Sequence, residues 1–226
     1  MAKRKYCHIW NIFKNNKIYT IPCTIDINYW KPLDKKISRK TLGFDINKKY
    51  FLFSAFNGIQ DERKGFDILM NALKKLEINK EEFIVIILGN ADNLYKINKL
   101  YKFEFKIYNQ NFNNDKDLLK TIYSACDILI MPSRLEAFGQ VALEAGSCGL
   151  PCVSFKNTGV EDIINHNEDG YLANYLDIED LTKGINLLNK ESINAKMSEK
   201  IRNKITKEFS YENISKKYKD IYETLI

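Results

Sequence analysis

Short apolar runs alternate along the chain with segments of helical periodicity. The runs are YFLFSAF (50–56), FIVIILG (83–89), FKIY (105–108), DILIMPS (127–133) and PCVSF (151–155), all rich in β-branched or aromatic residues. Near-continuous apolarity of this kind is typical of strands that are covered on both faces. We therefore expect these runs to form a buried sheet.

The segments between and after these runs carry apolar residues at helical spacing. FDILMNALKKL (66–76) has a single apolar stripe. The others are DLLKTIYSAC, the stretch after Gly139, DIEDLTKGINLLNK with Asp177 and Asp180 at its start, a polar helix from about Ile193, and YENISKKYKDIYETLI after Ser210. Alternating strands and helices indicate right-handed βαβ units, so we predict an α/β fold with a parallel sheet.

The segment before Tyr50 is less regular. IYTIP (18–22) is compatible with a strand, and NYWKPLDKKISRKTLGF predicts a loop followed by a short helix. No repeat, Pro/Ser linker or low-complexity tract divides the rest. We predict one domain over residues 18–226, preceded by a residual segment or linker at 1–17.

Composition indicates an ordinary globular protein of 226 residues, 45% hydrophobic and 28% charged. Thirty-five Lys and Arg against 29 Asp and Glu give a net charge of +6, but acids and bases are interleaved. No basic block stands out, so nucleic acid is not indicated as a partner.

Compartment is indicated by the cysteines and the N-terminus. The 5 cysteines include no CxxC pair, and several lie in apolar stretches, which favours free thiols in a reducing cytosol. The start MAKRKYCHIW lacks the apolar segment of a secretory signal, and no run approaches a membrane span. Lysine-rich helices near the C-terminus leave peripheral contact with anionic lipid open, although a solvated face explains them better.

Candidate chemistry lies at the ends of the predicted strands, where ligands bind in open parallel sheets. After the first strand, NGIQDERKGFD places Arg63 and Lys64 just before a helix, where two cations suit a diphosphate. After the second strand, Gly89 and Asn90 allow close approach to the backbone. Arg63 and Lys64 could instead be ordinary surface charges, but their position before a helix favours a phosphate site.

Two carboxylates follow the fourth strand, in PSRLEAFGQVALEAGSCGLPCV (132–153). Glu136 lies in a loop before Phe138 and Gly139, and Glu144 lies about a turn and a half inside the next helix. Both carboxylates can face one small ligand. A solvated helix position is the usual fate of a glutamate such as Glu144, but its neighbours are small and apolar, so a polar group there needs a reason.

These segments together resemble a known family. ERKGFDILMNALKKL, then ILG, then IYSACDILIMPSRLEAFGQVALEAGSCGLPCVSF and EFSYENISKKYKDIY resemble the retaining nucleotide-sugar glycosyltransferases of family 4. The resemblance runs from about Ile18 to the C-terminus. It implies the GT-B fold, whose C-terminal half is a Rossmann-like parallel sheet with helices on both faces.

The resemblance also implies roles for particular residues. Glu136 would contact hydroxyls of the transferred sugar, and Glu144 would hold the ribose hydroxyls of the nucleotide. Lys64 and Arg63 would stabilise the diphosphate. The backbone around Phe138, Gly139, Gln140 and Val141 would approach the sugar and diphosphate, and the strand end from Tyr108 to Gln110 would flank the base.

The chain departs from the family pattern in three respects. Ile59 stands where many members carry an arginine, five residues before Lys64, and IPCTID (21–26) replaces an IPNGVD-like entry. The resemblance covers only the second of two GT-B domains, so an acceptor half is expected to be missing. In the family, a histidine that assists the reaction lies on this acceptor half, and neither His8 nor His166 matches it.

Metal sites are not favoured. Asp115-Lys116-Asp117 spells the DxD of metal-dependent glycosyltransferases, but its position favours a helix cap at Asn114 or Asp115 with acids in the first turn. Cys148 and Cys152 lie four apart without histidine or acidic partners, so packing explains them better than zinc.

We therefore predict the donor-binding domain of a retaining, metal-independent glycosyltransferase of the hexosyl-transferring type. It takes a nucleotide-diphosphate sugar as co-substrate, needs no cofactor and serves glycan or polysaccharide assembly. A glycan or lipid-linked acceptor would bind a missing N-terminal domain or a partner subunit, so the isolated chain is expected to bind donor with little transfer. The alternatives are a non-catalytic nucleotide-sugar-binding module or truncated remnant, and, least favoured, a glycoside hydrolase using Glu136 and Glu144.

Overall fold

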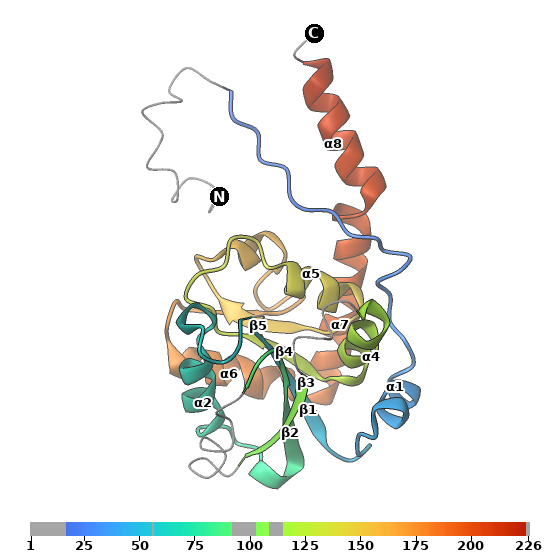
Figure 1. Ribbon diagram of the computed structural model, residues 1–226. Coiled ribbons are helices and arrows are strands. Elements are labelled where there is room, and N and C mark those ends of the chain that lie inside the picture. The colour runs from blue at the N-terminus through green and yellow to red at the C-terminus, as the bar shows by residue number, and fades with distance from the viewer. Residues whose placement is uncertain (1–16, 56, 92–102, 109–114, 225–226) are drawn as a thin grey trace.

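A parallel sheet of six strands forms the centre of the protein (Figure 1). The computed structural model describes residues 17–55, 57–91, 103–108 and 115–224. The strands are β1 (Lys49–Ser54), β2 (Phe83–Leu88), β3 (Glu104–Tyr108), β4 (Ile128–Met131), β5 (Cys152–Phe155) and β6 (Tyr171–Ala173). Their order, β3-β2-β1-β4-β5-β6, reverses direction between β1 and β4. The loops after β1 and β4 therefore diverge from a topological switch point, where open α/β sheets bind ligands.

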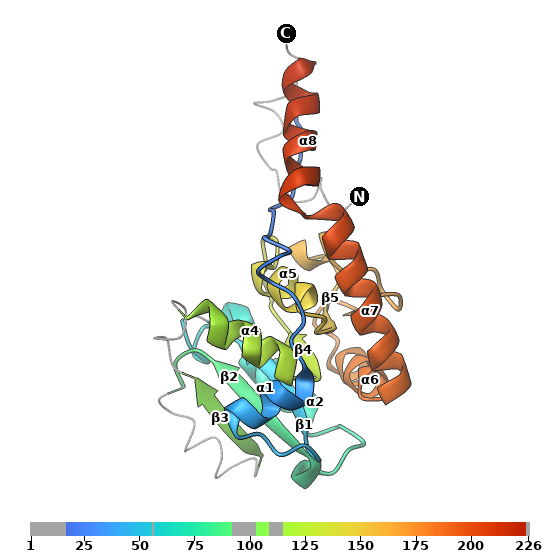
Figure 2. The same ribbon diagram turned by 90° about the vertical axis from the view of Figure 1, so that its right-hand side faces the viewer.

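The helices cover both faces of the sheet (Figures 1 and 2). They are α1 (Lys35–Leu42), α2 (Phe66–Leu73), α4 (Lys116–Ala125), α5 (Gln140–Ser147), α6 (Ile178–Leu188), α7 (Glu191–Glu208) and α8 (Tyr211–Glu223), with 3-10 turns at Glu62–Lys64, Lys80–Glu82 and Gly159–Asp162. The predicted α/β fold with a parallel sheet and helices on both faces is confirmed.

Side chains of the inner strands alternate between two apolar cores. Tyr50 and Leu52 of β1 join a core with α4, α5 and the second half of α7, whereas Phe51 and Phe53 join a second core with α2 and α6. All four are at most 1% exposed. Burial on both faces explains why the strands are apolar at consecutive positions.

The predicted helix caps are confirmed. Asp177 Oδ1 accepts a hydrogen bond from Asp180 N at 3.0 Å, and Ser210 Oγ accepts one from Asn213 N at 3.4 Å. Asp115 Oδ1 accepts one from Leu118 N at 2.9 Å, so the first acid of the DxD-like triplet caps α4 as predicted. Each cap satisfies an amide that has no partner inside its helix.

Two parts of the sequence interpretation were wrong or incomplete. IYTIP (18–22) forms no strand, because its backbone has no neighbouring strand; pairing begins only at Ile25, whose N–H donates to Phe209 O at 3.0 Å. The short strand β6 was not predicted. It pairs with β5 from Val153↔Tyr171 to Phe155↔Ala173 at the edge of the sheet.

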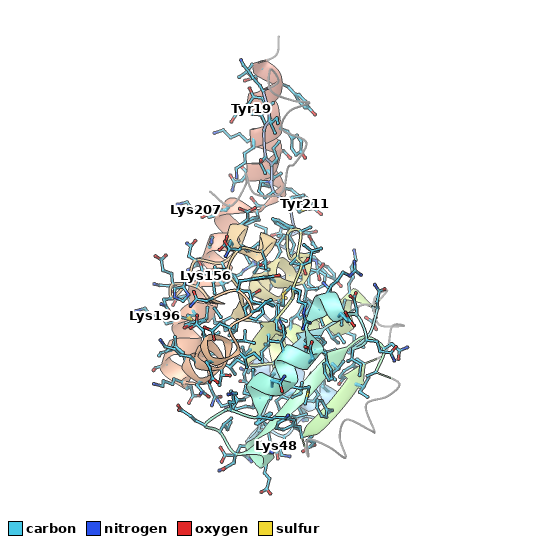
Figure 3. All side chains as sticks on the ribbon, turned by 90° about the vertical axis from the view of Figure 1, so that its left-hand side faces the viewer. Tyr19, Lys48, Lys156, Lys196, Lys207 and Tyr211 are labelled. Carbon is cyan, nitrogen blue, oxygen red and sulfur yellow. The ribbon has the colours of Figure 1, made fainter. Side chains whose placement is uncertain are left out.

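Helix α8 extends away from the sheet (Figures 1 and 2). In Figure 3, Tyr211 at the start of α8 and Lys48, which precedes β1, lie toward opposite ends of the molecule. Tyr211 thus lies toward the end of the molecule where the parallel strands finish. None of the helices in the described ranges is long and apolar enough to cross a membrane.

Candidate active site

The loops after β1 and β4 touch each other at the switch point. Gly65 has φ +71°, and a Cβ atom there would lie 2.1 Å from the carbonyl oxygen of Pro132. Beside this contact, Arg134 N donates to Arg63 O at 2.7 Å. Only glycine allows so close an approach in this conformation, so the Lys64-Gly65 sequence brings the two loops together.

This contact brings together Lys64 and Glu136, which are far apart in the sequence. Lys64 Nζ donates to Glu136 Oε2 at 2.9 Å, and the two side chains are 25% and 15% exposed. The ammonium is thus the positive group of a largely enclosed pair at the switch point. An anionic ligand that reaches this place would compete with Glu136 for Lys64.

Arg63 does not join this pair. Its guanidinium donates to both carboxylate oxygens of Asp61, at 2.9 and 2.8 Å, and its side chain is 63% exposed. These hydrogen bonds lower the pKa of Asp61 to about 2, despite the opposing effect of desolvation. Of the two cations that the sequence suggested for one site, the structure places only Lys64 against Glu136.

Glu144 lies on the second turn of α5, and its side chain is half-buried. Tyr123 Oη donates to Glu144 Oε2 at 3.2 Å, and Gln140 Nε2 donates to Oε1 at 3.4 Å. Burial raises the pKa of Glu144, and the two hydrogen bonds oppose that rise only in part. A carboxylate held in this way has acceptor capacity left for a pair of hydroxyl groups.

A pocket of about 380 Å³ adjoins Glu144. Its lining combines α5, the start of α4, the start of α8 and the segment before α1, and consists of Thr24, Ile25, Asp26, Tyr29, Trp30, Lys116, Gln140, Glu144 and Tyr211. Aromatic rings beside a carboxylate and an ammonium suit a ligand that has both a flat ring and hydroxyl groups.

The start of α5 is fixed between the two glutamates. Gly139 precedes the helix with φ +97°, and a Cβ there would lie 2.9 Å from Val160 Cγ2. Gly159 N donates to Glu136 O at 2.8 Å, and the Phe138 ring lies 6.2 Å from that of Phe209. The N–H groups of Gln140 and Val141 begin the helix, where the helix dipole favours an anion.

The ends of β2 and β3 adjoin the loop after β1. Gly89 N donates to Tyr108 O at 2.8 Å, and Ile59 N donates to Asn90 O at 2.9 Å. Gly58 packs directly on Asn90, since a Cβ there would lie 2.6 Å from Asn90 O. Burial raises the pKa of Tyr108 to about 12. The predicted residues Gly89, Asn90 and Tyr108 thus share this edge of the sheet, whereas Gln110 lies outside the described residues.

The DxD-like acids already have protein partners. Besides the cap made by Asp115, Asp117 Oδ1 accepts hydrogen bonds from Tyr29 Oη at 2.8 Å and from Lys120 Nζ at 3.1 Å. Cys148 and Cys152 are buried, and burial raises the pKa of both thiols. Among the residues that the structure describes, no group of three His, Cys, Asp or Glu side chains could hold a metal ion.

Sequence interpretation missed several residues of the site, among them Tyr123, Arg134 and most of the lining of the pocket beside Glu144. Tyr123 lies in a helix with an apolar stripe and gave no sign that its hydroxyl reaches Glu144. Arg134 stands two residues before Glu136, yet its partner Asp67 is 67 positions away in the chain. The apolar spacing of Tyr123 and the surface-like context of Arg134 gave no local signal for either contact.

Comparison with known proteins identifies the family. The family described as Glycosyl transferases group 1 matches residues 34–208. The chain belongs to this family. It is 25% identical over 216 residues to N-acetyl-alpha-D-glucosaminyl L-malate synthase of Bacillus anthracis, covering 92% of this chain and 54% of that protein. It is 23% identical over 215 residues to the Escherichia coli UDP-Gal:alpha-D-GlcNAc-diphosphoundecaprenol alpha-1,3-galactosyltransferase, covering 93% and 55%.

Solved glycosyltransferase structures share the fold. Sucrose-phosphate synthase from Thermosynechococcus elongatus superposes with a TM-score of 0.82 at 22% identity, covering 99% of this chain and 56% of that one. Anabaena Alr3699/HepE in complex with UDP-glucose superposes with a TM-score of 0.75 at 22% identity, covering 91% and 57%. The fold is that of a GT-B glycosyltransferase domain, and the chain spans about half the length of these relatives.

Proposed function

We propose that this chain is the donor-binding domain of a retaining glycosyltransferase of family 4 that transfers a hexosyl group from a nucleotide-diphosphate sugar without a metal ion. The observation that carries the proposal is the Lys64–Glu136 pair, 2.9 Å across, at the switch point of the sheet. Glu144 and its pocket lie on the next helix, α5. One ammonium and one helix N-terminus suit the diphosphate of such a donor, and two carboxylates suit the hydroxyl groups of its sugar and its ribose.

Each group has a role set by its chemistry. Lys64 and the N-terminus of α5 stabilise the negative charge that develops on the leaving diphosphate. Glu136 accepts hydrogen bonds from hydroxyls of the sugar, and Glu144 accepts them from the ribose. Because two positive groups already serve the diphosphate, the proposed reaction needs no divalent cation. Arg63 adds to this charge only if its guanidinium leaves Asp61.

The relatives support this choice of donor. HepE of Anabaena was solved in complex with UDP-glucose. The E. coli relative is named for galactosyl transfer to a lipid diphosphate-linked sugar. For this chain we propose a glycan or lipid-linked acceptor that is bound by protein outside residues 18–226, with a role in glycan assembly. Location in the cytosol or at the inner membrane face stays a prediction.

Calorimetric titration with UDP-glucose, GDP-mannose and ADP-glucose, each with and without EDTA, tests the proposal. One of the three should bind, with an affinity unchanged by EDTA. Binding of none to the folded chain would contradict the donor role, and loss of binding in EDTA would contradict metal independence. Once an acceptor is supplied, NMR of the product's anomeric proton tests whether the donor configuration is retained.

Matched variants separate the site from general effects of charge. Lys64→Met and Glu144→Gln should each weaken binding about tenfold or more, because each removes a charge-assisted hydrogen bond to the ligand. Lys75→Met and Glu179→Gln remove the two members of an exposed ion pair near the C-terminal end of α2. These controls should bind the donor like the unmodified chain.

A further inference from the structure

Arg134 makes hydrogen bonds to three separate parts of the chain. Its Nη1 and Nη2 donate to the two carboxylate oxygens of Asp67 at 2.8 and 2.7 Å, and Nη1 also donates to Glu62 O at 2.8 Å. Its backbone carbonyl accepts a hydrogen bond from Tyr175 Oη at 2.8 Å. The side chain thus joins the loop after β4 to the turn before α2 and to the first turn of that helix.

These bonds flank Lys64 in the sequence. Arg134 bonds the carbonyl groups of Glu62 through its guanidinium and of Arg63 through its backbone N–H. Asp67, three residues after Lys64, accepts hydrogen bonds from Nη1 and Nη2 of the guanidinium. Glu136 stands two residues beyond Arg134. Arg134 therefore bonds the backbone before Lys64 and the helix after it, and it belongs to the same loop as Glu136.

The value of this arrangement is geometric more than energetic. The side chains of Arg134 and Asp67 are 36% and 61% exposed, and ion pairs this exposed contribute little to stability. A two-pronged arginine–carboxylate contact nevertheless fixes orientation, because both N–H groups must align with both oxygens. Reacting groups need positions held to a fraction of an ångström, which requires such support from neighbours.

We propose that Arg134 is a positioning residue, which holds the Lys64–Glu136 pair in the geometry that the donor diphosphate and sugar meet. The proposal rests on the donor role proposed above for that pair. Arg134 acts through the two loops, so removing it lengthens or breaks the 2.9 Å contact between Lys64 and Glu136 while the sheet stays intact.

The rate at which Lys64 reacts with sulfo-NHS-acetate tests the positioning role without any ligand. Peptide mass spectrometry would follow Lys64, with Lys75 of the same sample as the internal reference. Arg134→Met and Asp67→Asn should each raise the rate at Lys64 severalfold relative to Lys75. Arg134→Lys should react as fast at Lys64 as Arg134→Met does, because a single ammonium cannot make the paired hydrogen bonds of a guanidinium to Asp67.

A double variant distinguishes positioning from general loosening. Glu136→Gln removes the partner of Lys64, so adding Arg134→Met to it should give no further increase in the Lys64 rate. An unchanged rate in the single Arg134→Met variant would overturn the proposal. So would an equal rise at Lys64 and Lys75, or an added rise in the double variant.

Donor binding supplies the second measurement. Arg134→Met should weaken binding of UDP-glucose, GDP-mannose or ADP-glucose, whichever binds the unmodified chain, by about tenfold to a hundredfold, while the thermal midpoint changes little. Unchanged binding would overturn the role of Arg134 in donor geometry. If the unmodified chain bound none of the three sugars, the donor role would fail, and the labelling rates would still decide whether Arg134 positions Lys64.

Discussion

Glu144 illustrates at the scale of one residue how a binding group lowers stability. Burial raises the pKa of its carboxyl, so the protonated form favours the folded state. Its contribution to stability is present at low pH and is lost as the pH rises through the folded-state pKa. At neutral pH the charged carboxylate lies among Tyr123, Gln140 and apolar neighbours and destabilises the chain.

Replacement of Glu144 by Gln should therefore raise the thermal midpoint at pH 7.5, and the advantage should shrink as the pH falls toward 4.5. The same variant should bind the donor more weakly. Thermal unfolding followed by circular dichroism over this pH range measures the effect, with Glu179→Gln on the exposed surface as the control. A midpoint at pH 7.5 equal to or below that of the unmodified chain would contradict the account of burial.

Lys64 forms an ion pair with Glu136 in the free protein, and a second prediction at the residue scale follows from this pair. A nucleoside diphosphate without sugar must compete with Glu136 for the ammonium. Glu136→Gln should therefore bind UDP about fivefold more tightly, the equivalent of about 1 kcal/mol, and yet lose affinity for UDP-glucose relative to UDP. If UDP is not the bound nucleotide, GDP or ADP takes its place. Weaker binding of both ligands by similar factors would show that Glu136 does not compete for Lys64.

The helix α5 depends on a glycine at its start. Gly139→Ala would place a Cβ at φ +97° and 2.9 Å from Val160 Cγ2, so the N-terminus of the helix must shift. Gly43, which ends α1 at φ +64° with open space around it, is the matched control. Both substitutions should lower the free energy of unfolding in urea by about 1–2 kcal/mol, because both strain an L-residue.

Only Gly139→Ala should also weaken donor binding, as measured by calorimetry. Equal donor affinity in the Gly139→Ala and Gly43→Ala variants would contradict a role for the α5 N-terminus. Both substitutions place an L-residue at positive φ, and Gly139→Ala adds the close contact with Val160 at the start of α5.

Elements were predictable where a local signal decides them. Strands buried on both faces show as apolar runs, and side-chain caps such as Asp177 and Ser210 act within three residues. The strand expected at residues 18–22 was wrong because an extended apolar segment becomes a strand only beside a partner strand. A local sequence pattern does not show whether such a partner is present. Strand β6 was missed because its three residues are too short to give a pattern.

The site was predictable only in part, for the same reason. The resemblance supplied Lys64, Glu136 and Glu144, but the contact between Lys64 and Glu136 depends on loops that meet through the fold. Asp61, two residues before Arg63, was available in the sequence as its partner and was overlooked. Arg134 and Tyr123 act on residues of other elements, and no local spacing reveals that.

At the scale of the whole molecule, stability should be unevenly distributed. Strands β1 and β2 are buried between two cores, whereas all but one of residues 215–224 of α8 and its end are exposed. Amides at 216–224 should therefore exchange with deuterium orders of magnitude faster than those of β2, since local opening there exposes little apolar surface. Mass spectrometry measures this exchange, with α7 as the reference helix. Equal protection of α7 and α8 would contradict the prediction.

The most direct test of the donor role asks how much Lys64 contributes to binding the diphosphate. Calorimetry would compare the unmodified chain and Lys64→Met, each titrated with uridine and with UDP, or with the guanosine or adenosine pair if that base binds more tightly. The account predicts that the unmodified chain strongly prefers the diphosphate and that Lys64→Met loses most of this preference, with little change for the nucleoside. An equal preference for the diphosphate in both proteins would contradict the assignment of the switch point between β1 and β4 as the diphosphate site.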